Sequence, residues 1–424
     1  MIIFDRKAYL DYLVSCEGNG MIKIITGTRR SGKSFLLFHL YKQNLLARGV
    51  KENHIVEVNL EDRRNKKLRN PDALLEHIDS KMTDGTTSSP TDKYYILLDE
   101  VQLVPEFEDV LNSYLHVKNV EVFVTGSNAK FLSKDVITEF RGRGWEIRVR
   151  PLSFAEIYEA KGGSETKLLA DYYRYGGLPR VVQLDSAEEK EAYLKEVFET
   201  VYLRDVVQRN HLRNADGLRE LVRVLASAMG SSMNVKRIVN TFKSEVGMDI
   251  SPNTIAKYLE HLEDSFIISE ALRYNVKGRK YIGTDTKYYF EDMGVRNAVL
   301  GFRQVEETHA MENVLYNELR KRRYQVDVGQ VDTWGKNADG KTFKRQLEVD
   351  FVVNKASERI YIQSTYAMPD REKEQQEQAS LLSINDAFKK MIIVGGYHIP
   401  RYNENGVLIM GLYDFLLDPQ SVER

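Results

Sequence analysis

The eight residues Gly27-Thr28-Arg29-Arg30-Ser31-Gly32-Lys33-Ser34 constrain this chain most, because they form the pattern G-x-x-x-x-G-K-S. An apolar run precedes the pattern and an amphipathic run begins at Phe35, which predicts a strand, a tight turn and a helix. Glycine lets the backbone adopt positive φ, so that its N–H groups turn inward around phosphate oxygens. The segment therefore predicts a phosphate-binding loop from Gly27 to Phe35.

Two side chains of this loop have specific expected roles. Lys33 is expected to reach the β- and γ-phosphates of a nucleoside triphosphate as a point charge. The Ser34 hydroxyl is expected to complete the coordination of a Mg²⁺ ion that bridges these phosphates. Gly-rich turns also join strands to helices in unrelated folds, but the fixed spacing and the flanking strand and helix favour a nucleotide site.

A second motif, which is acidic, follows a buried apolar run at 94–98. Asp99 and Glu100 stand where that predicted strand ends, which is the edge where ligands bind in open α/β sheets. Asp99 is expected to hold the Mg²⁺ through water, and Glu100 to orient and polarise the attacking water. The alternative is a strand that leaves the sheet through an acidic turn, and the upstream phosphate-binding loop favours the metal site.

Two further catalytic candidates come after the predicted strand 120–125. Ser127 or Asn128 is expected to contact the γ-phosphate and the attacking water, or to cap a helix over 129–140, and the two roles are compatible. Arg141 or Arg143 is expected to act as a finger on the γ-phosphate, from the same subunit or a neighbour, although both also fit exposed surface positions. With Lys33 and Glu100, we assign Asn128 and Arg143 to the catalytic set.

Composition limits the possible classes of protein. The length of 424 residues predicts two to four domains, and the balance of 61 basic against 62 acidic residues excludes a global field that recruits nucleic acid or membrane. No stretch has the length of a membrane span, and the N-terminus lacks the order of a signal peptide, so we expect a cytoplasmic protein. The single Cys16 excludes an internal disulfide and a thiolate zinc cluster.

The middle of the chain has the pattern of a winged helix. Helices are expected over 218–229 and 235–244, a third begins at Pro252 behind a Ser251 cap, and a hairpin follows over 267–282. The third helix carries few cations against three carboxylates and is a poor reader of DNA, whereas the hairpin is basic. A domain-packing or protein-binding role is the alternative. The candidate DNA contacts are Lys257, Arg273, Lys277, Arg279 and Lys280.

The last part of the chain has a pattern similar to a metal-dependent nuclease core. Glu312 lies on an expected helix over 308–323, and Asp350 and Gln363 lie on alternating strands over 347–353 and 359–365. Thr365 stands where that core has a lysine, and a hydroxyl cannot supply the positive charge that stabilises an activated water. We therefore interpret the three residues Glu312, Asp350 and Gln363 as a vestigial site, in a domain kept for assembly or docking.

Taken together, these motifs resemble the AAA-type P-loop ATPases of prokaryotes that carry a C-terminal domain related to restriction endonucleases. The resemblance rests on Thr28-Arg29-Arg30, Leu98-Asp99-Glu100-Val101-Gln102, Thr125-Gly126-Ser127-Asn128 and Arg150-Pro151-Leu152-Ser153-Phe154. It implies an α/β fold with a five-stranded P-loop core over 1–160 and a helical lid or connector over 161–215. A winged helix over 216–284 and a restriction-endonuclease-like domain over 285–424 are expected to follow.

The function expected from these motifs is a Mg²⁺-dependent ATPase that couples hydrolysis to rearrangement of the appended domains. The expected cofactors are ATP and Mg²⁺. ATP is expected rather than GTP because no N-K-x-D motif for reading guanine is present. One alternative is an ATP-bound switch or scaffold with little turnover, and another is an ATP-gated DNA nuclease. DNA or a protein is the expected partner, and a homo-oligomer is expected if an arginine acts across a subunit interface.

Overall fold

The computed structural model describes residues 2–83, 93–126, 142–212, 214–281, 283, 285–303, 305–336 and 342–423. Its contacts group the chain into two compact units. The first comprises Met1–Pro151 with Asp264–Phe266, and the second comprises Leu152–Glu263 and Ile267–Arg424. The contacts therefore divide the chain nine residues before the boundary expected at 160. The finer division with boundaries at 160, 215 and 284 stays a prediction.

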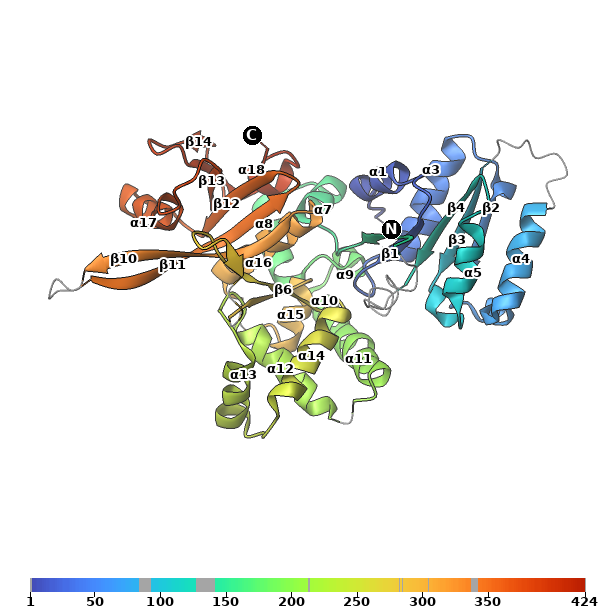
Figure 1. Ribbon diagram of the computed structural model, residues 1–424, viewed down its shortest axis with the longest axis horizontal. Helices are drawn as coiled ribbons and strands as arrows, with labels where there is room; N and C mark the ends of the chain where they lie inside the picture. Colours follow the sequence, from blue (N-terminus) through green and yellow to red (C-terminus); the bar gives the residue numbers. More distant parts are fainter. Residues whose placement is uncertain are drawn as a thin grey trace. The chain divides into compact units, whose positions relative to one another are not determined.

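The first unit is built on a parallel sheet of five strands in the order β2-β3-β4-β1-β5 (Figure 1). This confirms the expected five-stranded core, with β1 and β3 directly before the two predicted motifs. Helix α2 continues through a π-helical turn at Leu36–Tyr41 into α3. The elements are α1 (Lys7–Ser15), β1 (Ile22–Thr26), α2 (Lys33–Phe35), α3 (Lys42–Ala47), β2 (Ile55–Asn59), α4 (Pro71–Thr83), β3 (Tyr94–Asp99), α5 (Phe107–Tyr114), β4 (Val120–Thr125) and β5 (Gly144–Arg148).

Alternate residues of these strands pack against helices on opposite faces of the sheet. Ile24, Leu98 and Val124 belong to the core beneath α4 and α5, whereas Ile25 and Leu97 pack with α1, Leu36–Tyr41 and α3. Strands covered on both faces read as continuous apolar runs, which is why the sequence pattern predicts them well. The covered sheet leaves its carboxyl edge as the place where polar side chains gather.

The second unit begins with helices and continues into a large mixed sheet. Its helical part comprises α7 (Phe154–Lys161), α8 (Glu165–Tyr175), α9 (Pro179–Gln183), α10 (Ala187–Glu196), α11 (Arg204–Arg209), α12 (Ala215–Ser227), α13 (Val235–Thr241), α14 (Pro252–Asp264) and α15 (Met293–Val299). Its remaining elements are β6 (Ile268–Ala271), β7 (Arg273–Asn275), β8 (Lys280–Tyr281), β9 (Lys287–Phe290), α16 (Glu307–Lys321), β10 (Gln325–Lys336), β11 (Thr342–Lys355), β12 (Glu358–Thr365), α17 (Arg371–Leu382), β13 (Lys389–Val394), β14 (Arg401–Tyr402), β15 (Leu408–Gly411) and α18 (Leu412–Leu417).

The three helices expected between 216 and 264 form as α12, α13 and α14, and the Ser251 hydroxyl accepts the Thr254 N–H at 3.1 Å. The hairpin expected over 267–282 forms only in its second half, where β7 pairs with β8, and its first half pairs elsewhere. Strand β6 pairs with β9, and the chain then changes sheets, so that β7 pairs with β8 and with β10. The reason is that the two halves are buried in different cores, since Ile268 packs with the helices and Val276 packs beneath the large sheet.

The large sheet has the strand order β14-β15-β13-β12-β11-β10-β7-β8. Strands β10, β11 and β12 form an antiparallel meander, and α17 crosses over so that β13 runs parallel to β12. Helix α16 packs on one face with α18, and α17 covers the other (Figure 1). The meander confirms the expected adjacency of the strands that carry Asp350 and Gln363.

The turn at Gly176–Gly177 is held by a buried carboxylate. Asp292 Oδ2 accepts the Gly177 N–H at 2.7 Å, and Asp292 Oδ1 accepts the Val295 N–H at 3.0 Å. A Cβ at Gly176, where φ is +71°, would lie 2.2 Å from Asp292 Oδ1. These contacts favour a fixed structural turn. Among the helices that the structure describes, none is long and apolar enough to cross a membrane.

Candidate nucleotide site and a second carboxylate cluster

The predicted phosphate-binding loop lies between β1 and α2, and its two glycines have the positive φ that the pattern predicts. Gly27 has φ +129° and Gly32 has φ +93°. A Cβ at Gly27 would also lie 2.0 Å from the carbonyl oxygen of Val149, so only glycine fits beside the end of β5. The loop backbone is therefore shaped by both glycine positions.

Lys33 is anchored by the loop that precedes it. Its Nζ donates to the carbonyl oxygens of Gly27 at 2.9 Å and of Thr28 at 3.0 Å. Burial lowers the pKa of Lys33 to about 8, while the nearby charges of Glu100 and Asp99 partly oppose this effect. The ammonium is thus held in place by neutral carbonyl groups at the mouth of the loop.

Asp99 lies beside the loop and is bonded to two hydroxyls. The Ser34 hydroxyl donates to Asp99 Oδ1 at 2.9 Å, and the Thr125 hydroxyl donates to the same oxygen. Thr125 Oγ1 in turn accepts the Glu100 N–H at 3.1 Å. Burial raises the pKa of Asp99, and the hydrogen bonds from both hydroxyls lower it only in part. The predicted metal pair, Ser34 and Asp99, is therefore in direct contact.

Thr125 was missed by the sequence interpretation, which placed the polar contact two or three residues later. The signal was present, because an apolar strand that ends in threonine lies next to β3, with Leu98 opposite Val124 in the register. Ser127, Asn128 and Arg141 lie outside the described residues. Their expected roles remain predictions.

Glu100 leaves the sheet in the left-handed conformation, with φ +55° and ψ +47°. Its carboxylate accepts a hydrogen bond from the Gln102 amide. A non-glycine residue in this region costs energy, and such strain clusters at functional sites. The neighbouring Gln102, a member of the quoted motif, thereby orients the carboxylate that was expected to polarise water.

The side chains around the loop fit a triphosphate with Mg²⁺. Within the part of the chain that the structure describes, the buried Ser31 hydroxyl has no hydrogen-bond partner, so it is free to donate to a phosphate oxygen. Ser34 and Asp99 supply the oxygen ligands that Mg²⁺ prefers. Lys33 supplies the cation.

Arg143 lies at the amino end of β5, whereas the residues above lie at the carboxyl ends of the parallel strands. Its carbonyl oxygen accepts the N–H of Ile22, at the start of β1, and β5 runs parallel to β1 from Gly144 onward. The carboxyl end of β5 instead carries Arg148, opposite Thr26. The structure therefore does not bring Arg143 to the loop of its own chain.

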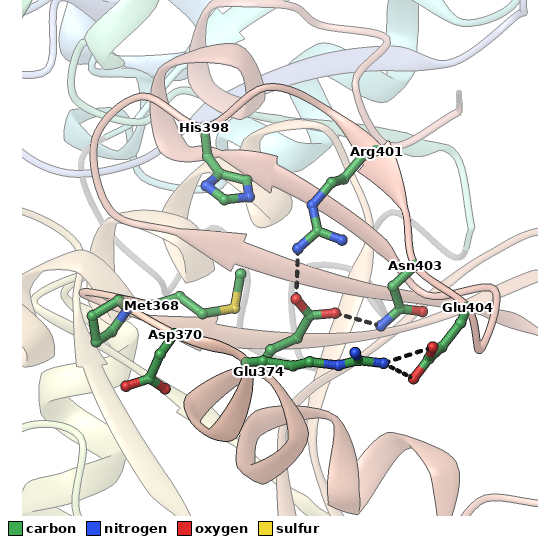
Figure 2. A pocket seen from close by; sticks show the side chains of 9 residues that line it. Met368, Asp370, Glu374, His398, Arg401, Asn403 and Glu404 are labelled. Atoms are coloured by element: carbon green, nitrogen blue, oxygen red, sulfur yellow. Dashed lines mark hydrogen bonds and ion pairs between the residues drawn. The ribbon is translucent and has the colours of Figure 1, made fainter.

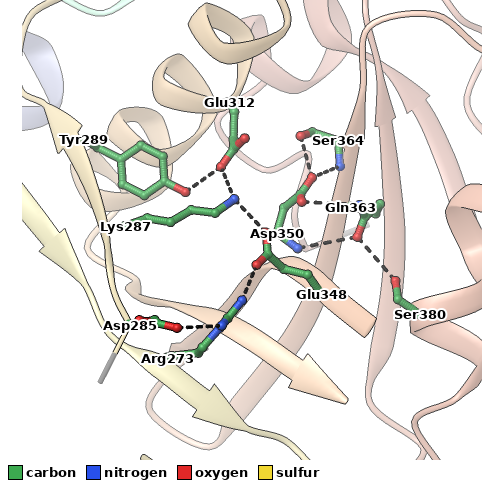
Figure 3. Close-up of polar contacts among 10 residues, drawn as sticks. All are labelled: Arg273, Asp285, Lys287, Tyr289, Glu312, Glu348, Asp350, Gln363, Ser364 and Ser380. Atoms are coloured by element: carbon green, nitrogen blue, oxygen red, sulfur yellow. Dashed lines mark hydrogen bonds and ion pairs between the residues drawn. The ribbon is translucent and has the colours of Figure 1, made fainter. Parts of the chain in front are cut away.

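The three residues interpreted as a vestigial nuclease site lie near one another in the second unit (Figure 3). Asp350 Oδ2 accepts the Ser364 N–H at 2.8 Å and the Ser364 hydroxyl at 2.7 Å. Asp350 Oδ1 accepts the Gln363 amide at 3.3 Å. Burial, together with the charge of Glu312, raises the pKa of Asp350 to about 7. Thr365, at the expected lysine position, donates instead to the carbonyl oxygen of Ala367 at 3.1 Å.

A lysine from another strand lies in this cluster, and the sequence interpretation missed it. Lys287 on β9 places Nζ 2.9 Å from Glu312 Oε1 and 2.8 Å from Glu348 Oε1 (Figure 3). Burial alone would lower the pKa of Lys287, but the charges of Glu312, Glu348 and Asp350 outweigh it and raise the pKa. The available signal was a single lysine at the head of the wholly buried strand Lys287–Phe290.

The five candidate DNA contacts separate into two groups. Arg273 is mostly buried and donates to Glu348 Oε2 at 2.6 Å, so its charge is used within the second unit. The other four are exposed. They are Lys257 on α14 and, in and beside the turn from β7 to β8, Lys277, Arg279 and Lys280.

A pocket of about 410 Å³ also opens beside the start of α17 (Figure 2). Much of its charge is internally paired, since Arg401 donates to Glu374 at 2.5 Å and Arg371 donates to Glu404 at 2.8 Å. None of the side chains predicted to form a site lines it.

Comparison with known proteins assigns part of the chain. Residues 19–158 match the model of the AAA domain, and residues 166–306 match a domain of unknown function, DUF8612. The solved structure of the Aeropyrum pernix ORC1 protein in complex with DNA is 14% identical, with a TM-score of 0.29, over 70% of this chain and 92% of that chain. Cdc6p from Pyrobaculum aerophilum is 15% identical, with a TM-score of 0.29, over 71% and 95%.

Two curated relatives match most of the chain. An uncharacterized protein of Methanocaldococcus jannaschii is 26% identical over 377 residues, which are 86% of this chain and 79% of that protein. An uncharacterized protein of Haemophilus influenzae is 32% identical over 420 residues, which are 98% of this chain and 99% of that protein. The chain therefore belongs to the same family as the Haemophilus influenzae protein, and residues 19–158 form its P-loop AAA domain.

Proposed function

We propose that the protein is a Mg²⁺-dependent ATPase whose turnover rearranges the second unit. The observation that carries this proposal is the contact of Ser34 with Asp99 beside the anchored Lys33 and the strained Glu100. These side chains come from two segments that are far apart in the sequence. They meet at the edge of the sheet where open α/β folds bind ligands.

Each side chain has a distinct task in this proposal. Lys33 exchanges carbonyl partners for phosphate oxygens, and its compact ammonium balances the charge of the terminal phosphates. Ser34 and Asp99 hold the metal, which when bound neutralises charge on the β- and γ-phosphates. Glu100 accepts a hydrogen bond from the attacking water and orients it, since its carboxylate is already fixed by Gln102.

Thr125 is the proposed positioning residue of this site. Its hydroxyl joins Asp99 to the Glu100 N–H, so that the metal ligand and the water-orienting carboxylate share one support. Asn128 is proposed to contact the γ-phosphate. Because Arg143 lies at the amino end of its own strand, away from the loop, we propose that it acts as a finger from a neighbouring copy of the chain in a homo-oligomer.

We further propose that the second unit, with its winged helix and its nuclease-like sheet, is the part that nucleotide turnover moves. DNA is the partner class favoured by the exposed basic turn of Lys277, Arg279 and Lys280. Loss of salt-dependent duplex binding in the triple alanine variant would support this, and unchanged binding would exclude the turn as the contact.

Turnover measurements on the full chain test the ATPase proposal. Glu100→Gln is expected to keep ATP binding and to lose most phosphate release, whereas the matched control Glu76→Gln, on an exposed face of α4, should retain both. Binding without turnover in the wild type would instead support a nucleotide-operated switch. Turnover that survives Glu100→Gln would contradict the role of this carboxylate.

A further inference from the structure

The cluster around Lys287 raises the question of what balances its three carboxylates. Glu312 comes from α16, and Glu348 and Asp350 come from β11, where residues two apart face the same side of the strand. Glu312, Asp350 and Lys287 are buried. Carboxylates brought together in this way repel one another and require a cation between them.

A nuclease-like core would use a divalent metal ion as that cation, but the residues present do not fit one. Glu312 Oε1 and Glu348 Oε1 lie 2.9 Å and 2.8 Å from the Lys287 ammonium. Glu312 Oε1 also accepts the Tyr289 hydroxyl at 2.7 Å. A Mg²⁺ ion needs oxygen ligands at about 2.1 Å, and at that distance it would be forced against the ammonium.

The second oxygen of Glu348 and both oxygens of Asp350 are also bonded to protein donors. Glu348 Oε2 accepts Arg273 Nη2 at 2.6 Å, and both oxygens of Asp350 accept donors from Ser364 or Gln363. Within the described part of the chain, no group of three or more histidine, cysteine or acidic side chains is arranged to hold a metal ion. The donor set therefore faces Lys287 and Arg273.

We infer that Lys287 takes the cation position of this nuclease-like site and makes it a metal-independent clamp that joins β9 to α16 and β11. The lysine reaches the site from a strand outside the predicted motif, so the clamp ties the strand after the winged helix to the C-terminal sheet. The site has therefore not only lost the lysine expected at Thr365 but has gained a different lysine, Lys287, among its carboxylates. The position that a metal would fill is taken by a covalently attached charge.

The test measures Mn²⁺ binding to the full chain by calorimetry and electron paramagnetic resonance. All variants carry Asp99→Asn, so that the nucleotide site does not contribute. With Lys287 present, neither Glu312→Gln nor Asp350→Asn is expected to change Mn²⁺ binding. Lys287→Met exposes the carboxylates to solvent cations and is expected to tighten Mn²⁺ binding at least tenfold, and Lys287→Arg is not.

A matched control separates this effect from the loss of any buried lysine. Lys321 pairs with Glu156 at 3.1 Å elsewhere in the second unit, so Lys321→Met should weaken folding without a gain in Mn²⁺ binding. Adding Asp350→Asn to Lys287→Met should abolish the gain. Two results would overturn the inference: Mn²⁺ binding with Lys287 intact that Glu312→Gln abolishes, or a folded Lys287→Met variant without the gain. The comparison of Mn²⁺ binding with and without Glu312→Gln, both with Lys287 intact, remains decisive even if Lys287→Met does not fold.

Discussion

The sites around Lys33 and Lys287 each contain a buried lysine near carboxylates, and they use the lysine in opposite ways. Lys33 donates to two neutral carbonyl oxygens, and burial lowers its pKa to about 8. Lys287 contacts two carboxylates directly, and their charges raise its pKa in spite of burial. A lysine held by carbonyl groups keeps its charge for an incoming anion, whereas a lysine held by carboxylates has its charge neutralised within the fold.

The strongest way to break this contrast is to remove the charge at Lys287. Lys287→Met is expected to lower the free energy of unfolding of the second unit by about 3–5 kcal/mol, because it leaves buried carboxylates without a partner. Calorimetric unfolding with separately resolved transitions measures the loss. Adding Glu312→Gln and Glu348→Gln should recover part of it. A Lys287→Met protein as stable as the wild type would show that the ion pairs contribute nothing.

The second prediction concerns Asp99, a carboxylate of the nucleotide site around Lys33. Asp99→Asn is expected to reduce ATP turnover by about a hundredfold or more, because a neutral amide holds the metal poorly. The folding of both units should be nearly unchanged, since Ser34 and Thr125 donate to the same oxygen of Asp99 and the amide oxygen of asparagine can accept both. Phosphate release at saturating Mg²⁺ checks the first part and calorimetry the second. Wild-type turnover in this variant would remove Asp99 from the metal site.

The nucleotide site was predictable largely because its determinants are local. The glycine spacing from 27 to 32 and the acidic end of β3 are contiguous in the sequence, and the flanking runs have clear periods. Thr125 needed one further fact, that β4 lies next to β3 in the sheet. Arg143 directly precedes β5, so it lies at the amino end of that strand, away from the loop of its own chain, and of the two expected sources of a finger only a neighbouring subunit remains for it.

Lys287 was harder to predict because its role depends on pairings between distant segments. It reaches Glu312 and Glu348 only because β9 pairs with β6 and because the chain changes sheets after Ala271. The sequence between 267 and 282 reads as one hairpin, and nothing local marks the division. The missing lysine at Thr365 was readable, whereas for Lys287 the sequence showed only a lone lysine in an apolar strand and not its carboxylate partners.

The third prediction uses the pH dependence of Asp350. Its pKa of about 7 in the folded protein exceeds the value of about 4 expected when unfolded, so the folded state binds its proton more tightly. The stability contributed by this group is complete below pH 4 and is lost as the pH rises through 7. Urea unfolding at pH 5 and pH 8 should show wild type losing stability relative to Asp350→Asn. Parallel curves for the two proteins would contradict the assignment.

The smallest expected effect comes from Thr125→Val, which keeps the shape and removes the hydroxyl. Asp99 then loses a donor and the Glu100 N–H loses an acceptor, so turnover should fall about tenfold, with a smaller change in KM. Thr125→Ser should restore most of the turnover because it returns the hydroxyl. Steady-state kinetics of the three proteins checks this, and equal turnover in all of them would show that the shared support is unimportant.

The most direct test of the account is the affinity for ATP with and without Mg²⁺, measured by calorimetry on wild type, Lys33→Ala and the control Lys81→Ala on α4. The account predicts Mg²⁺-dependent binding in the wild type and the control, and a loss of about a hundredfold or more in Lys33→Ala, because Lys33 is the residue whose ammonium the loop carbonyls hold. Equal affinity in all three proteins, or binding indifferent to Mg²⁺, would contradict it.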